Sequence, residues 1–162
     1  MDLIAQYEIP YLHPLVVHFP LVLLLLGAGA ATLYAALGRG VWRRAALVFF
    51  VLGTASAWAA QETGQDLIRD MEGDPIVEQV GERHAQAAEW TVLTSAFAGL
   101  VFVGLSLVAL RKPPVVEGET PPRRPRERLW GRLLALVPAL AAAALVAYTA
   151  HLGGIMVWGV PR

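Results

Sequence analysis

The sequence predicts an all-α integral membrane protein, a bundle of four transmembrane helices, on the strength of three observations. Hydrophobic residues make up 56% of the chain and charged residues only 16%, against about a quarter charged in an ordinary soluble domain. The apolar residues gather in four long runs. The charged residues lie between these runs, with basic and acidic residues in different connections.

Each run can cross a hydrocarbon core of about 30 Å, which takes about 20 helical residues. The helices are expected at 15–38, 42–60, 75–111 and 130–157, with a proline-rich cytoplasmic linker at 112–128. Residues 1–162 are therefore expected to form a single four-helix domain. Because Asp2 and Glu8 precede the first run and no basic residue does, that run is not expected to be a cleaved signal peptide.

Basic residues predict the orientation of the bundle. Ten of the 13 lysines and arginines lie in or beside the connections between the first and second and between the third and fourth runs, so these connections are expected in the cytoplasm. The connection between the second and third runs is mainly acidic. Both termini and this acidic connection are expected on the periplasmic side of a bacterial inner membrane, which the protein crosses several times.

The third helix has a clear predicted start. Asp74 is a good N-cap, and Pro75 suits the first helical position. Ile76, Val80 and His84 then recur at four-residue spacing, which predicts one apolar stripe. We therefore expect this helix to project above the membrane, with His84 facing protein.

All four histidines are expected near the periplasmic end of the bundle. With a rise of about 1.5 Å per residue from the cytoplasmic arginines, His18 and His151 stand at about 31 and 28 Å. His84 and His13 stand at about 40 and 39 Å by the same estimate. The rise therefore predicts two levels with two histidines at each.

Two imidazoles from different helices at one level are what six-coordinate haem requires. His18 and His151 are the preferred pair, and His84 and His13 would serve a second haem or an alternative pairing. One or two haem b groups are therefore expected. A hydrogen-bonded pair that only joins helices would also explain the deeper two.

Three further residues are candidates for contacts with the cofactor. Arg83 and Arg69 are the only basic residues of the acidic connection, and their guanidinium groups could pair with haem propionates. A surface ion pair with a neighbouring acid is the alternative for both. Tyr148, one turn before His151, could donate a hydrogen bond to a ligand or simply belong to the interfacial aromatic belt.

Two segments carry a resemblance. The opening His13-Pro14-Leu15-Val16-Val17-His18-Phe19-Pro20 and the ending His151-Leu152-Gly153-Gly154 resemble the signature of a bacterial family of four-helix membrane proteins of unknown function. The resemblance covers the whole chain. Family members resemble small b-type cytochromes in helix count and in histidines near helix ends, and some are joined to cytochrome c or Rieske-type domains. The resemblance therefore implies electron transfer.

The expected function is that of a haem-b-binding subunit of a respiratory or photosynthetic complex, an electron-transfer subunit rather than a free-standing enzyme. Its expected partners are the lipid bilayer, other membrane subunits, a periplasmic cytochrome c and a quinol, and no nucleic acid. Two alternatives remain open. Three or four histidines could gather around copper or zinc, or the protein could be a non-redox scaffold or assembly subunit.

Overall fold

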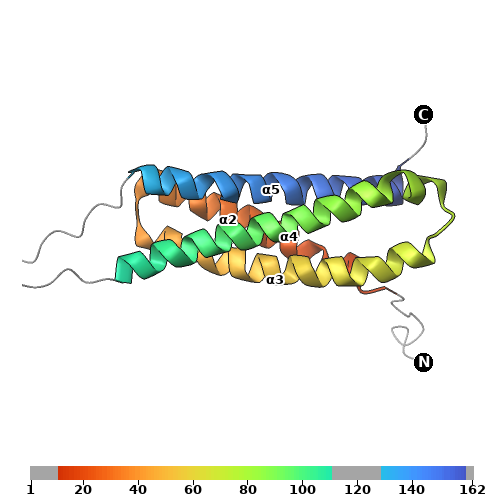
Figure 1. The fold of residues 1–162 in the computed structure, drawn as a ribbon, viewed down its shortest axis with the longest axis horizontal. Helices are drawn as coiled ribbons and strands as arrows, with labels where there is room; N and C mark the ends of the chain where they lie inside the picture. Colours follow the sequence, from red (N-terminus) through yellow and green to blue (C-terminus); the bar gives the residue numbers. More distant parts are fainter. Residues whose placement is uncertain (1–10, 111–128, 160–162) are drawn as a thin grey trace, which may run out of the picture.

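The structure is a computed structural model that describes residues 11–110 and 129–159, and Figure 1 shows it as a bundle of long helices packed side by side. The helices are α1 (His13–Val16), α2 (His18–Leu37), α3 (Gly40–Asp70), α4 (Pro75–Leu110) and α5 (Leu129–Trp158). With α1 and α2 joined as one span, the described residues hold four helical segments long and apolar enough to cross a membrane. The predicted all-α class and the four spans are confirmed. The predicted linker at 112–128 lies outside the described residues.

The helix boundaries differ from the prediction mainly in α3. This helix was expected at 42–60, but it continues to Asp70. Residues 61–70 are mostly polar, so the apolar run ends before them. The prediction followed the apolar run, but a helix can continue beyond the lipid into water. The first span starts at His13 rather than at residue 15 and is interrupted at Val17, because Pro20 has no N–H to donate to the carbonyl four residues earlier.

The helices run alternately up and down, and each long helix packs against two neighbours in the ring order α2, α3, α4, α5. We call the end with α1, the α3–α4 connection and the last turns of α5 the outer end (right in Figure 1). The inner end holds the α2–α3 connection, the end of α4 and the start of α5. The four histidines all belong to the outer half, as the chain order of the helices requires.

The polar segments at the outer end lengthen two helices beyond the bilayer. The 31 residues of α3 and the 36 of α4 span about 46 and 54 Å, whereas the hydrocarbon core is about 30 Å thick. The excess lies at the outer end because residues 61–70 and the first turns of α4 are rich in charge. These two helices therefore carry the outer end into the interfacial layer or beyond it.

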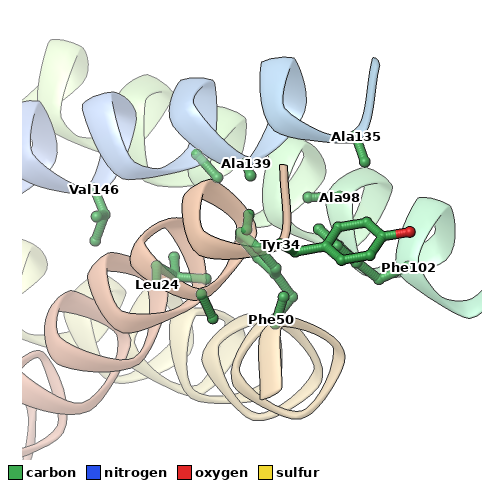
Figure 2. Close-up of a cluster of buried hydrophobic side chains, with 12 residues drawn as sticks. Leu24, Tyr34, Phe50, Ala98, Phe102, Ala135, Ala139 and Val146 are labelled. Atoms are coloured by element: carbon green, nitrogen blue, oxygen red, sulfur yellow. The ribbon is translucent and has the colours of Figure 1, made fainter. Parts of the chain in front are cut away.

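Small side chains let the helices approach closely around an aromatic core. Phe102 stacks on Phe50 with ring centroids 5.8 Å apart and meets Tyr34 edge-on at 6.1 Å. Alanines from α4 and α5 surround these rings (Figure 2). At Gly53, an added Cβ would lie 2.6 Å from Leu24 Cδ2, so α2 and α3 touch there through the missing side chain.

Two glycines permit the short turns between the helices. Gly38 ends α2 in the left-handed conformation with φ of 63°, and its N–H donates to the Tyr34 carbonyl. Gly73, with φ of 94°, turns the chain between α3 and α4. The Asp74 carboxylate then accepts hydrogen bonds from the N–H groups of Ile76 and Val77, at 2.8 and 3.3 Å. The predicted N-cap of α4 is therefore confirmed.

Candidate functional site

His13 is fixed against α3 by its imidazole. Its Nδ1 lies 2.9 Å from the Ala60 carbonyl oxygen and 3.4 Å from Thr63 Oγ1. A carbonyl only accepts, so Nδ1 carries a proton, and in the neutral imidazole Nε2 keeps its lone pair. The ring rests on Gly64, where an added Cβ would lie 2.8 Å from His13 Cε1.

His84 is fixed against α5 in the same way. Its Nδ1 donates to the Thr149 carbonyl oxygen at 3.0 Å, and its ring rests on Gly153, where an added Cβ would lie 3.3 Å from His84 Cε1. The Thr149 and Thr91 hydroxyls lie 3.1 Å apart and join α5 to α4 beside this contact. His84 therefore faces protein, as its place on the apolar stripe predicts.

The two histidine contacts repeat one arrangement. In each, an imidazole near the outer end of the bundle donates a hydrogen bond to a backbone carbonyl of the neighbouring helix in its hairpin. The ring also packs on the glycine four residues after that carbonyl. The carbonyl and glycine are Ala60 and Gly64 for His13, and Thr149 and Gly153 for His84. The two helical hairpins, α1–α3 and α4–α5, thus offer matching histidines to each other.

The hairpins bring the two rings together at the outer end of the bundle. The ring centroids of His13 and His84 lie 6.5 Å apart, and the ring planes make an angle of 84°. The expectation that these two histidines share a level is met. Because both Nδ1 atoms are held by backbone carbonyls, the nitrogens that remain for a ligand are the two Nε2 atoms.

The other two histidines, preferred from the sequence as axial ligands, are both exposed. His151 lies two residues from Thr149 and two from Gly153, so it points about 200° around α5 from the face that meets α4. His18 stands in the same relation to the buried Pro20. Within the described residues no contact joins His18 to His151. Helical rise predicted their level, but the direction of the side chains was left out.

A groove opens beside the histidine pair. It has a volume of about 600 Å³ and lies between the end of α3 and the start of α4. Ile68, one turn after Gly64, and Gly81, one turn before His84, belong to its lining, so the groove continues outward from the pair. Three carboxylates also line it: Glu72, Glu78 and Glu82. A cation near the pair would therefore meet a negative field.

The three residues proposed beside the cofactor lie on the surface. Arg69 pairs with Asp66 at 3.2 Å, both side chains being mostly exposed, so the surface ion pair considered as its alternative is what the structure shows. Arg83 is exposed. Tyr148 is 48% exposed and lies on the outer surface of α5. None of them contacts either half-buried imidazole in the described part of the chain.

Sequence reasoning missed the groups that hold the imidazoles. Carbonyl acceptors leave no trace in a sequence, and Gly64 lies in a polar stretch that was not expected to be helical. One signal was available, since Gly64 and Gly153 are each preceded four residues earlier by a small residue on the same face. Within the described ranges, no group of three or more His, Asp or Glu side chains could share a metal ion. The predicted gathering of three or four histidines is therefore not found.

The fold and the site define a class of protein. It is a membrane-spanning four-helix bundle with a half-buried histidine pair near one end. The chain belongs to the DUF2231 family of predicted membrane proteins, whose family model matches residues 9–160. This match agrees with the resemblance noted in the sequence and places nearly the whole chain in the family. Neither a curated protein nor a solved structure matches the chain.

Proposed function

We propose that the protein is a haem-b-binding membrane subunit that carries electrons near the outer end of the bundle, with His13 and His84 as the axial ligands. One observation carries this proposal: two imidazoles from different hairpins face one another with their ring centroids 6.5 Å apart. Two imidazoles on opposite sides of one metal ion have ring centres about 6 Å apart, because a metal–nitrogen bond is about 2 Å long and the ring centre lies about 1 Å further.

The hydrogen bonds support the same assignment. Metal-bound histidines usually donate their second ring nitrogen to a carbonyl or carboxylate, which fixes the ring and its tautomer. His13 and His84 both do so, to Ala60 and Thr149. Haem supplies four nitrogens of its own, so two protein ligands complete its coordination. When bound, the iron would supply the one-electron chemistry, and the protein would orient it.

The location suits exchange of electrons with a partner outside the membrane. The pair lies toward the outer end, about 13 Å along α4 from Pro75, and the acidic groove lies between the pair and the α3–α4 connection. We expect this end to face the periplasm because the basic residues gather at the other end. A periplasmic cytochrome c with a basic surface would be attracted by the carboxylates, and a quinol in the bilayer would be the complementary partner.

A reduced-minus-oxidised visible spectrum of the purified protein tests the proposal. The protein is produced with added iron and haem precursor in cells that also load a known b-type cytochrome. We expect the absorption bands of a low-spin b-type haem in a fixed ratio to protein. If the control cytochrome is loaded and this protein shows no bands, haem binding is rejected.

The acidic groove favours one second candidate, a site for a copper or zinc ion held by imidazole and carboxylate ligands. The carboxylates of Glu72, Glu78 and Glu82 line the groove that begins one turn from the imidazoles, and their field would concentrate cations there. Metal analysis of the same preparation separates the candidates: copper or zinc bound without haem bands supports the cation site. A colourless protein without metal supports the scaffold alternative.

A further inference from the structure

A layer of polar side chains closes the core at the inner end of the bundle. Tyr34 is fully buried, and Arg132 is 7% exposed. Among residues 11–110 and 129–159, neither the Tyr34 hydroxyl nor Arg132 Nε has a hydrogen-bond partner, and the buried hydroxyl of Ser106 has none either. Buried polar atoms in folded proteins are nearly always hydrogen-bonded, so three unpartnered atoms in one layer call for an explanation.

Residue spacing indicates that these three side chains lie at a similar height along the bundle. Figure 2 shows the Tyr34 hydroxyl pointing away from Leu24 and Val146, along the bundle to the side on which Ala135 and Phe102 lie. Arg132 precedes Ala135 by one turn, and Ser106 follows Phe102, which touches the Tyr34 ring, by one turn. All three side chains therefore belong to the layer just inward of the aromatic core.

Arg132 is also held in place by Gly38. An added Cβ at Gly38 would lie 2.5 Å from Arg132 Nη1, so the guanidinium occupies the space that the glycine leaves at the end of α2. The carbonyls at a helix C-terminus carry partial negative charge, which offsets part of the cost of burying the cation. No carboxylate of the described residues lies within ion-pair distance of it. Within the part of the chain that the structure describes, this buried guanidinium therefore has no anionic partner.

We propose that the inner end of the bundle binds a phosphate group between the Arg132 guanidinium and the hydroxyls of Tyr34 and Ser106. A guanidinium offers parallel N–H donors that match phosphate oxygens, and two hydroxyls can donate to the remaining oxygens. The layer lies where the apolar runs end, which is the depth of lipid headgroups. Arg43 on α3 corresponds in position to Arg132 on α5. Arg43 lies 21 residues before Gly64, on which His13 packs, and Arg132 lies 21 residues before Gly153, on which His84 packs. Arg43 therefore stands at a similar height along the bundle, on the helix diagonal to α5.

Calorimetric titration of the whole protein, delipidated in a neutral detergent, tests the site. One arm uses inorganic phosphate, the other a short-chain phosphatidylglycerol, and sodium chloride at equal ionic strength and short-chain phosphatidylcholine are the controls. Binding of phosphatidylglycerol alone identifies a lipid headgroup as the ligand, and binding of inorganic phosphate identifies a free phosphate group. Both results support the site. Binding of neither above the controls overturns it.

Substitutions locate the binding. Tyr34→Phe removes only an unpartnered hydroxyl, so we expect no loss of thermal stability but a roughly tenfold weaker affinity. Arg132→Gln should weaken binding by about a hundredfold or more. The exposed Arg44 lies near the same end, so Arg44→Gln is the matched control and should bind as the unchanged protein does. If Arg132→Gln lowers the unfolding temperature but binds phosphate like Arg44→Gln, Arg132 only caps α2 and the proposal is wrong.

Discussion

The imidazole rings of His13 and His84 lie 6.5 Å apart and nearly perpendicular, although His13 begins the first span and His84 lies in the third. Each ring is fixed to the helix that follows it in its own hairpin. The distance between the rings is thus set by how the two hairpins pack, and the nitrogens left for a ligand come one from each hairpin.

Replacement of either histidine of the pair should remove the proposed haem. His13→Ala and His84→Ala each leave the iron with one protein ligand, so we expect the low-spin spectrum to be lost in both variants alike. Electron paramagnetic resonance of the oxidised protein measures this. The exposed His18 and His151 are the controls, and His18→Ala and His151→Ala should keep the signal. Loss of the signal in His151→Ala and its retention in His84→Ala would restore the pairing favoured by helical rise alone.

The glycine under His13 can be tested independently of any cofactor. A Cβ at Gly64 would lie 2.8 Å from the imidazole, so Gly64→Ala should displace the ring and destabilise the protein by about 1–3 kcal/mol. Gly153→Ala, at 3.3 Å, should have a smaller effect. Nothing lies within 4 Å of a Cβ at Gly104, which makes Gly104→Ala the control, expected to be neutral or slightly stabilising. Unfolding in detergent should rank the three variants in this order, and equal effects would contradict the contact.

The stacked aromatic pair should dominate the stability of the core. Phe50 is fully buried against Phe102, so Phe50→Ala should cost about 3–5 kcal/mol. Phe97 is 59% exposed on α4 and faces lipid, so Phe97→Ala should cost far less. The measurement is the unfolding free energy in mixed micelles. A similar loss of unfolding free energy in Phe50→Ala and Phe97→Ala would contradict the burial of Phe50 in the core.

The contact between Tyr11 and Asp70 should show in a titration. The hydrogen bond to the Asp70 carboxylate, and its negative charge, raise the pKa of Tyr11 above the ordinary value of 10.0. A raised pKa means that the contact is intact below about pH 10 and is lost as pH rises through the folded-state value. Ultraviolet titration should show one tyrosine that ionises at lower pH in Asp70→Asn than in the unchanged protein. Identical curves would show that the contact does not persist in solution.

The basic residues predict the orientation of the bundle, and reporter fusions test this prediction. The acidic connection around Asp70 and a fusion after Arg162 should lie outside the cytoplasm, and position 124 inside it. A periplasmic reporter should be active at the first two positions and a cytoplasmic reporter at the third. The opposite pattern would move the histidine pair to the cytoplasmic face.

Much of the fold could be predicted because bilayer thickness limits helix length and because caps are local. Asp74 and Pro75 identified the start of α4, and the four apolar runs identified the four spans. The end of α3 could not be predicted, since residues 61–70 are held by contacts to the first span and not by lipid. The sequence predicted only that His13 and His84 stand at the same height along the bundle, because helical rise is the same for every residue. The direction in which each side chain points depends on how the helices pack, which the rise does not give.

The repeated histidine contact left only one weak signal in the sequence, the small residue four positions before each glycine. Its acceptors are the carbonyls of Ala60 and Thr149, whose side chains are unrelated, and its glycines lie in different surroundings. The correspondence between Arg43 and Arg132 has the same 21-residue spacing but depends on knowing which glycines to count from. A similar contact can thus recur where the surrounding side chains share little beyond the histidine and the glycine.

Because His13 is fastened to α3 and His84 to α5, neither imidazole can follow the other when the hairpins separate. A displacement of one hairpin by an ångström would change the interval between the Nε2 atoms by a similar amount. The affinity for a ligand held between the two imidazoles would therefore depend on how closely the two hairpins pack along the whole bundle. A neighbouring protein that separates the hairpins or presses them together would change this affinity without contacting the site.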